Sequence, residues 1–154
     1  MTYESLLDET EKNDIYVIEN ANFISHADGL INGDVIGLNR KIRSQVKRSC
    51  ILAEELGHYH TTVGNILDQT NTGNRKQEYR ARLWAYNKMI GLSGIIAAYK
   101  ANVHNRYEMA EYLDVTEEFL DEALSCYREK YGICTKFDNY IIYFEPTIAV
   151  LEIF

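Results

Sequence analysis

The residues best suited to chemistry lie in one short segment, residues 52–58 with the sequence L-A-E-E-L-G-H. It differs by one residue from H-E-x-x-H, a helical motif in which two histidines one turn apart bind zinc and the first glutamate is the general base. Glu55 and His58 occupy the positions of the base and the second ligand, and Glu54 stands where the first histidine would be. The segment therefore predicts a metal site of altered composition.

Helical geometry predicts that Glu54 and His58 project together. Side chains at positions i and i+4 lie on one helix face about one turn apart, so these two could share a metal ion. Glu55 is rotated by one position, which suits a base that contacts the attacking water without binding the metal. A Glu/His/Glu ligand set is harder and more negative than His/His/Glu, so it suits zinc and also Mn²⁺ or Fe²⁺.

A catalytic zinc that keeps one position open needs a third protein ligand. The best candidate is Glu78, which begins the segment E-Y-R-A-R-L-W-A at residues 78–85. The alanines of this segment would let its helix pack against the motif helix and point Glu78 inward. Gly57 would permit that close approach, although glycine costs about 1 kcal/mol of helix propensity relative to alanine. Four other possible donors have no motif around them and are interpreted as surface or hydrogen-bonded side chains: His26, His60, Asp68 and His104.

The elements that must position these residues follow from hydrophobic periodicity, caps and turn residues. We expect helices at 2–13, 44–62, 75–90, 105–113 and 116–131, with a possible continuation over 95–100. We expect strands at 15–18, 140–144 and 148–154, a hairpin over 30–38 that turns at Asn32-Gly33, and a polar loop over 64–73. The order helix, small sheet, then helices predicts an α+β fold.

The composition is typical of a globular protein, with 46% hydrophobic and 25% charged residues in 154. That length suits one compact domain, 1–154. No apolar run approaches the roughly 20 residues that cross a bilayer, and the N-terminus lacks the features of a signal peptide, so we expect a cytoplasmic protein. The three cysteines, Cys50, Cys126 and Cys134, form no C-x-x-C pair, which predicts reduced thiols and neither a zinc knuckle nor a redox motif.

Charge is unevenly distributed along the chain. The net charge of −7 argues against nonspecific binding to nucleic acid through the whole surface. Ten of the sixteen basic residues nevertheless lie between Arg40 and Lys88, and the last third of the chain is acidic. A basic face near the motif could steer an acidic partner, although such a spread is more often an ordinary solvated helix surface.

These segments resemble a known family. Residues 52–58 resemble the L-A-H-E-L-G-H string of the ImmA/IrrE metallo-endopeptidases, and residues 78–85 resemble that family's downstream E-x-x-A-x-x-F-A segment. Residues 34–39 (D-V-I-G-L-N) resemble the edge strand that precedes the motif helix, and residues 107–116 resemble the stretch after the third ligand. The resemblance covers about 1–132, and the C-terminal strands in 133–154 have no parallel in it.

The resemblance implies a minimal zincin-like fold, in which a small twisted sheet accompanies an active-site helix and a second helix bearing a glutamate. It implies zinc, a water nucleophile, and cleavage of a protein partner similar to the helix-turn-helix repressors encoded beside such proteases in prophages and mobile elements. Glu55 would be the general base, with His58 and Glu78 as ligands and Glu54 in place of the first histidine. Nucleic acid and membranes are not expected as direct partners, and the oligomeric state stays open.

The same resemblance leads to an expectation for the bound substrate. It would lie extended along residues 35–38 and add a strand at that edge of the sheet. Tyr59, Tyr79 or His104 would stabilise the oxyanion, and the sequence does not choose between them.

Two other functions compete with hydrolysis. Residues 107–131 could form a helix-turn-helix that binds DNA, but residues 106–132 contain eight acidic and three basic side chains, which is unfavourable next to phosphates. The second alternative is a metal-free pseudopeptidase that keeps the fold and acts as a protein-binding regulator, because the first ligand position is altered.

Overall fold

The computed structural model describes residues 1–62 and 71–153. Within them the chain is a mixture of helices and two small sheets, which confirms the predicted α+β class. The chain divides into two compact units, Met1–Lys88 and Met89–Phe154, and each is described by itself.

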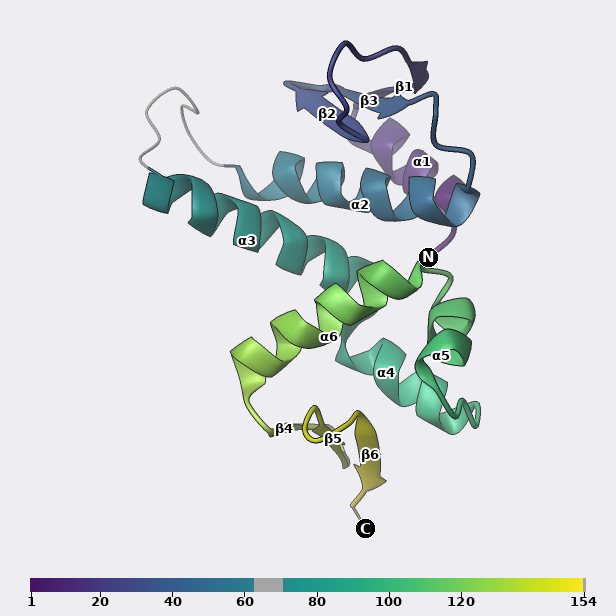
Figure 1. The fold of residues 1–154 in the computed structure, drawn as a ribbon, viewed down its shortest axis with the longest axis vertical. Coiled ribbons are helices and arrows are strands. Elements are labelled where there is room, and N and C mark those ends of the chain that lie inside the picture. Colours follow the sequence, from purple (N-terminus) through teal and green to yellow (C-terminus); the bar gives the residue numbers. More distant parts are fainter. Residues whose placement is uncertain (63–70, 154) are drawn as a thin grey trace. The chain divides into compact units, whose positions relative to one another are not determined.

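The first unit holds the segment predicted to do chemistry. Its elements are α1 (Tyr3–Lys12), β1 (Tyr16–Ala21), β2 (Gly29–Asn32), β3 (Val35–Asn39), α2 (Gln45–Thr61) and most of α3 (Asn71–Met89) (Figure 1). Helix α2 carries Glu54, Glu55 and His58, and α3 carries Glu78. The predicted helices at 2–13, 44–62 and 75–90 are therefore all present.

Helix α2 has clear local signals at both ends. The Ser44 hydroxyl caps its start by accepting from the backbone N–H of Lys47 at 3.2 Å, and the helix ends where Thr62 turns extended. A continuous run of its residues is buried, from Ser49 to Ala53 and again at Leu56 and Gly57. This buried face packs against α1, β2 and β3, so the helix is fixed in place beneath the sheet.

The first sheet has the order β1-β3-β2, with β3 parallel to β1 and antiparallel to β2. The expectation that residues 35–38 form an edge strand is therefore wrong, because β3 is hydrogen-bonded on both sides. The hairpin is present, but its turn is shifted by one residue. Asn32 pairs with Val35, which leaves Gly33 and Asp34 as the central residues, and only Gly33 has a positive φ (+59°).

Helix α3 begins earlier than predicted. Residues 71–73 are helical, so the predicted loop over 64–73 is wrong at that end, and its remaining residues, 64–70, lie outside the described part of the chain.

The second unit contains α4 (Gly91–Lys100), α5 (Arg106–Leu113), α6 (Glu117–Tyr131) and an antiparallel sheet of β4 (Cys134–Phe137), β5 (Tyr140–Tyr143) and β6 (Ala149–Glu152). The helix ends carry local signals: the Asn105 side chain accepts from Glu108 N–H, the Thr116 side chain accepts from Phe119 N–H, and Gly132 follows α6 with φ +82°. Strand β4 was not predicted. No helix in the described ranges is long and apolar enough to cross a bilayer.

Candidate functional site

Helices α2 and α3 meet backbone to backbone at Gly57. An ideal Cβ built at Gly57 would lie 2.2 Å from the carbonyl oxygen of Ala81 and 3.0 Å from its carbonyl carbon. Unbonded carbon and oxygen atoms rarely approach closer than about 3.3 Å, so only a hydrogen atom fits between the two helices here. Ala81 and Ala85 are both buried, which is the small-residue packing that the sequence predicts.

This close crossing brings Glu78 to His58. Glu78 lies one turn before Ala81 on α3, and His58 directly follows Gly57 on α2. The His58 Nε2 atom lies 3.4 Å from the Glu78 Oε2 atom, and their side chains are 27% and 46% exposed. The pair is therefore open to solvent on one side. The other carboxylate oxygen of Glu78, Oε1, accepts from the Nε atom of Arg82 at 3.1 Å.

Glu55 points toward the sheet and is partly buried. Its Oε1 atom would be 2.9 Å from a Cβ placed at Gly29, at the start of β2, so the carboxylate lies directly against that strand. The pKa of Glu55 is raised from 4.5 to about 7, mainly by burial and in addition by the negative charges of Glu54 and Glu78. The three carboxylates are therefore close enough for their charges to interact.

A cavity opens beside His58, at the end of the helix crossing. It has a volume of about 470 Å³ and is lined by Ile31, Asn32, Gly33, Asp34, His58, Tyr59, Thr62 and Gln77. The wall opposite α2 comes from the β2–β3 turn, so the cavity joins the turn to the histidine. Tyr59, one of the three residues expected near the oxyanion, lines it, whereas Tyr79 is exposed and His104 belongs to the other compact unit.

One family model matches the chain over the region that contains these features. The IrrE N-terminal-like domain of the peptidase M78 family matches residues 5–125, which is more than half of the 154 residues. The chain belongs to the peptidase M78 family. This confirms the resemblance to the ImmA/IrrE metallo-endopeptidases, and the mixed helices and small sheets agree with a small zincin-like domain. Among curated proteins and among solved structures, no chain matches it.

Membership of the M78 family implies a metal cofactor, and the donor types of this site suit one. An imidazole nitrogen and a carboxylate oxygen 3.4 Å apart, at His58 and Glu78, can bind the same divalent ion. No group of three His, Cys, Asp or Glu side chains in the described parts of the chain is arranged to hold a metal. The structure thus brings together two of the three predicted ligands, His58 and Glu78, and the third, Glu54, lies one turn before His58 on α2.

Arg82 is a site residue of this M78 domain that sequence reasoning missed. Burial lowers its pKa, and the charges of Glu78, Tyr86 and Glu54 more than reverse that effect, so its pKa is raised overall. The guanidinium therefore lies in the field of both Glu78 and Glu54 and holds the Glu78 carboxylate in place. The i, i+4 spacing of Glu78 and Arg82 was the signal that could have found it. The turn residue Asp34 and Gln77, which line the cavity, carried no such signal.

The other possible donors lie apart from the pair. His60 is exposed and stacks on Trp84 with ring centroids 4.8 Å apart, so it forms a separate contact between α2 and α3. His26 is exposed in the segment before β2, and Asp68 lies outside the described residues.

The raised pKa of Glu55 predicts a pH-dependent stability for the metal-free M78 domain. Below about pH 4.5 the Glu55 carboxyl is protonated in both the folded and the unfolded state, so its contribution to the free energy of unfolding is fully present. As the pH rises through about 7 that stability is lost, because the folded state must then hold a partly buried charge. The separation between 4.5 and about 7 corresponds to up to about 3 kcal/mol.

Urea unfolding in the presence of EDTA checks this prediction. Glu55→Gln should be more stable than the unsubstituted protein by about 2–3 kcal/mol near pH 8, and close to equal near pH 4.5. Taking the difference between the two proteins cancels the titration of the other carboxylates. A stability difference that is the same at both pH values would contradict the assigned burial of Glu55.

Proposed function

We propose that this chain is a zinc-dependent endopeptidase that hydrolyses a protein partner. The observation that carries the proposal is the 3.4 Å approach of His58 to Glu78, because it unites residues from two helices at the positions that match the family motif. Glu54, His58 and Glu78 would hold the metal, which supplies a Lewis acid that polarises the scissile carbonyl. Mn²⁺ or Fe²⁺ would also suit two carboxylates and one imidazole.

Glu55 is the residue to which we assign proton transfer. Glu55 lies in the helical turn before His58, and its carboxylate is directed toward β2. That direction suits contact with the attacking water and not with the metal. The carboxylate would accept a proton from that water and deliver it to the nitrogen of the leaving amine, so each turnover returns Glu55 to its starting state.

The open edge of β2 is the place where we expect an extended substrate to bind. β3 is covered on both sides, whereas β2 is hydrogen-bonded only to β3 in the described sheet. Gly29 in β2 touches Glu55, and Ile31 and Asn32 line the cavity beside His58. A substrate strand added to β2 would therefore pass directly over the catalytic carboxylate, with the cavity receiving one of its side chains.

The partner we propose is a helix-turn-helix repressor of a prophage or mobile element. The support for it is the resemblance of residues 52–58 and 78–85 to the ImmA/IrrE family, together with the family match. Co-expression with a helix-turn-helix repressor encoded beside the chain's own gene, followed by immunoblotting, tests this. A repressor that stays intact in the presence of the unsubstituted protein would contradict the assignment.

Metal binding distinguishes the proposed hydrolase from a metal-free binding protein. The specific argument for the metal-free alternative is the glutamate at position 54. We expect the purified protein to bind one zinc ion by elemental analysis and to be stabilised by added zinc in thermal unfolding. Glu54→His should increase the affinity for zinc relative to Mn²⁺ by roughly tenfold, because imidazole is the softer ligand. Protein that takes up no transition metal, before or after this substitution, would support the metal-free regulator.

A further inference from the structure

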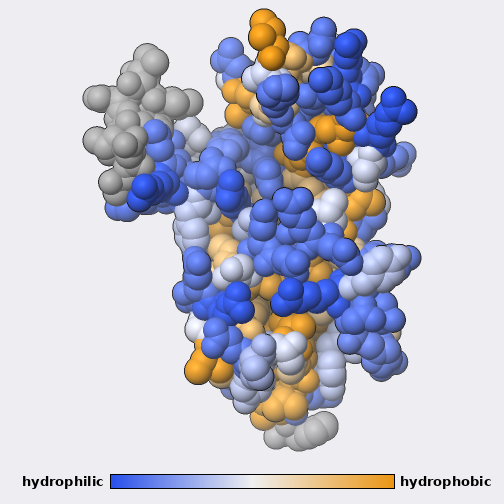
Figure 2. Space-filling model, viewed as in Figure 1, coloured by the Kyte–Doolittle hydropathy of each residue, from blue (hydrophilic) through white to orange (hydrophobic). Residues whose placement is uncertain are grey.

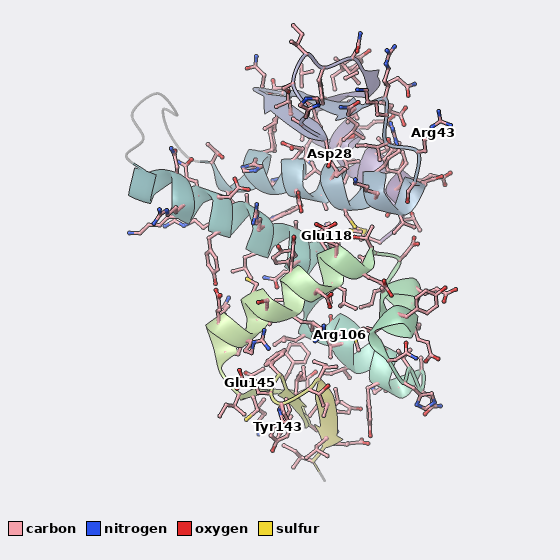
Figure 3. All side chains as sticks on the ribbon, in the orientation of Figure 1. Asp28, Arg43, Arg106, Glu118, Tyr143 and Glu145 are labelled. Carbon is pink, nitrogen blue, oxygen red and sulfur yellow. The ribbon has the colours of Figure 1, made fainter. Side chains whose placement is uncertain are left out.

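A group of basic side chains lies where β3 leads into α2. Five of the nine residues from 40 to 48 are basic, and four of them, Arg40, Lys41, Arg43 and Lys47, are exposed and are called here the basic cluster. Figure 2 shows strongly hydrophilic surface around the N-terminal end of α2, and Figure 3 labels Arg43 there with its side chain directed away from the ribbon. The fifth, Arg48, is different, because its guanidinium donates to the backbone oxygens of Ile42 and Glu19.

The basic cluster is not neutralised by acidic neighbours. In the parts of the chain that the structure describes, the side chains of Arg40, Lys41 and Arg43 have no carboxylate within ion-pair distance. Lys47 has only Asp28, at 3.8 Å, and both of these side chains are about half exposed. Exposed pairs of this kind contribute little energy, so a stronger anionic ligand could displace the contact.

The backbone that presents the basic cluster is well ordered by hydrogen bonds. Arg40 N–H donates to the Ala21 oxygen at 2.9 Å, and Lys41 N–H donates to Asn39 Oδ1 at 3.0 Å. Asn39 is itself buried, and its amide donates to the Ala27 oxygen at 2.9 Å. The backbone that carries these cations is therefore fixed, and binding a ligand there would not require a loop to become ordered.

Strand β2 connects Lys47, one member of the basic cluster, to the end of α2 that carries Glu55 and His58. Asp28, just before β2, contacts Lys47; Gly29 contacts Glu55; and the far end of the strand lines the cavity beside His58. Lys47 and Glu55 are eight residues apart on α2, which is about 12 Å along the helix. An extended polypeptide covers that distance in about four residues.

We infer that the basic cluster is a docking surface for an acidic segment of the protein substrate, about four to six residues from the bond that is cut. This inference rests on the proposed peptidase function, because it places the acidic segment on the same extended chain that crosses Glu55. Opposite charges there would speed the encounter and fix the register of the substrate on β2. The chemistry that the surface recognises is a run of aspartate or glutamate side chains in an extended conformation.

A protein ligand fits this surface better than nucleic acid does. Residues 1–88 contain twelve acidic and eleven basic side chains, and the whole chain has a net charge of −7, so the positive region is local. Specific binding to a duplex draws on many phosphate contacts over a wide basic face. Four cations within eight residues of sequence, one of them next to the start of β2, match a short extended peptide instead.

A binding experiment that does not depend on cleavage tests the inference. The probe is fluorescein-labelled hexaglutamate, and its binding to the full-length Glu55→Gln protein is followed by fluorescence anisotropy at about 0.05 M and about 0.3 M salt. In that background, Arg40→Glu/Lys41→Glu/Arg43→Glu should weaken binding at least about tenfold at low salt. The matched control, Lys12→Glu/Lys130→Glu/Lys136→Glu, changes the net charge equally at exposed positions elsewhere and should weaken it less than about threefold. Circular dichroism verifies that each variant is folded.

Three results of the binding experiment would overturn the inference. They are no measurable binding of hexaglutamate at low salt, equal loss of binding in the two triple variants, and tighter binding of a duplex DNA of equal charge through the same residues. Failure of the proposed function looks different, because it is an absence of metal uptake or of repressor cleavage by the unsubstituted protein. If metal uptake fails while hexaglutamate still binds the basic cluster selectively, the docking surface stands as part of a binding protein. If cleavage proceeds equally well in the Arg40/Lys41/Arg43 variant, the docking surface fails and the peptidase stands.

Discussion

Gly57→Ala is expected to lower the free energy of unfolding by about 2–3 kcal/mol and to separate His58 from Glu78. The added methyl group would lie 2.2 Å from the Ala81 carbonyl oxygen, so α3 must move away from α2 by about 1 Å. Forcing extra atoms into a close-packed contact costs about 1–3 kcal/mol. We expect a steric cost near or above about 3 kcal/mol here, because the methyl group would meet backbone atoms, which cannot rotate away. The better helix propensity of alanine offsets only about 1 kcal/mol of that cost.

Trp84 offers a direct readout of this substitution. It is the only tryptophan in the chain, and it stacks on His60 across the same pair of helices. Urea unfolding followed by its fluorescence should show a lower midpoint for Gly57→Ala, and zinc should no longer stabilise the variant. A variant as stable as the parent that still binds zinc would show that the two helices are not held this close.

Gly94→Ala is the matched control for that experiment. Gly94 is also a helical glycine, but a Cβ there would meet the end of the Leu113 side chain at 3.2 Å, and that side chain can rotate away. The substitution should change stability by less than about 1 kcal/mol and leave zinc binding unchanged. The contrast between the two glycines isolates the effect of the Ala81 carbonyl from the general effect of a helical glycine.

The parts of this structure that the sequence predicts well are set by local interactions. The bounds of α2 follow from the Ser44 cap and from an apolar face that recurs with the helical period. The meeting of Glu78 with α2 follows from Gly57 and from two alanines spaced one turn apart, since small side chains are the requirement for a close helix crossing. The same reasoning could not state how near Glu54 would lie to the other two donors, because rotamers depend on neighbours from several elements.

The parts that were wrong or missed depend on contacts between residues distant in the sequence. Strand β3 reads as a hairpin partner of β2, and nothing local indicates that β1 also pairs with it in parallel. The edge of the sheet was therefore assigned to the wrong strand. Strand β4 (Cys134–Phe137) is only four residues long and contains Cys134 and Lys136 between and beside its two strand-favouring residues, so pairing with β5 and not local composition defines it. The role of Arg82 likewise depends on burial and on Glu54 from another helix.

The position of Glu54 gives the site a physical character that a second histidine would not. Three carboxylates, from Glu54, Glu55 and Glu78, interact electrostatically, and Arg82 provides a compensating charge for Glu78 and Glu54. A divalent cation would relieve this repulsion more fully than one guanidinium, so the carboxylate substitution increases the electrostatic attraction for a metal even as it makes the ligand set harder. Loss of the histidine therefore does not by itself imply loss of metal binding.

Glu55→Gln is expected to reduce hydrolysis of the protein partner by about 10²–10⁴-fold while leaving metal binding intact. Glutamine has nearly the same shape but cannot accept and return a proton, so the water is no longer activated. The measurements are single-turnover cleavage of the purified repressor and zinc affinity by isothermal titration calorimetry. Glu54→Gln is the matched control. It makes the same change at the adjacent residue, which we assign as a metal ligand, so zinc affinity and cleavage should both fall.

The expected stability of Glu55→Gln allows its loss of cleavage to be assigned to the missing carboxylate. Because burial disfavours the charged form of Glu55, Glu55→Gln should be more stable than the parent near pH 8, so lost activity cannot arise from unfolding. A protein that is more stable, binds zinc and no longer cleaves has lost only the chemistry supplied by that carboxylate. If Glu55→Gln still cleaves the partner, another residue must act as the general base, and Tyr59 in the cavity wall would be the first candidate to test.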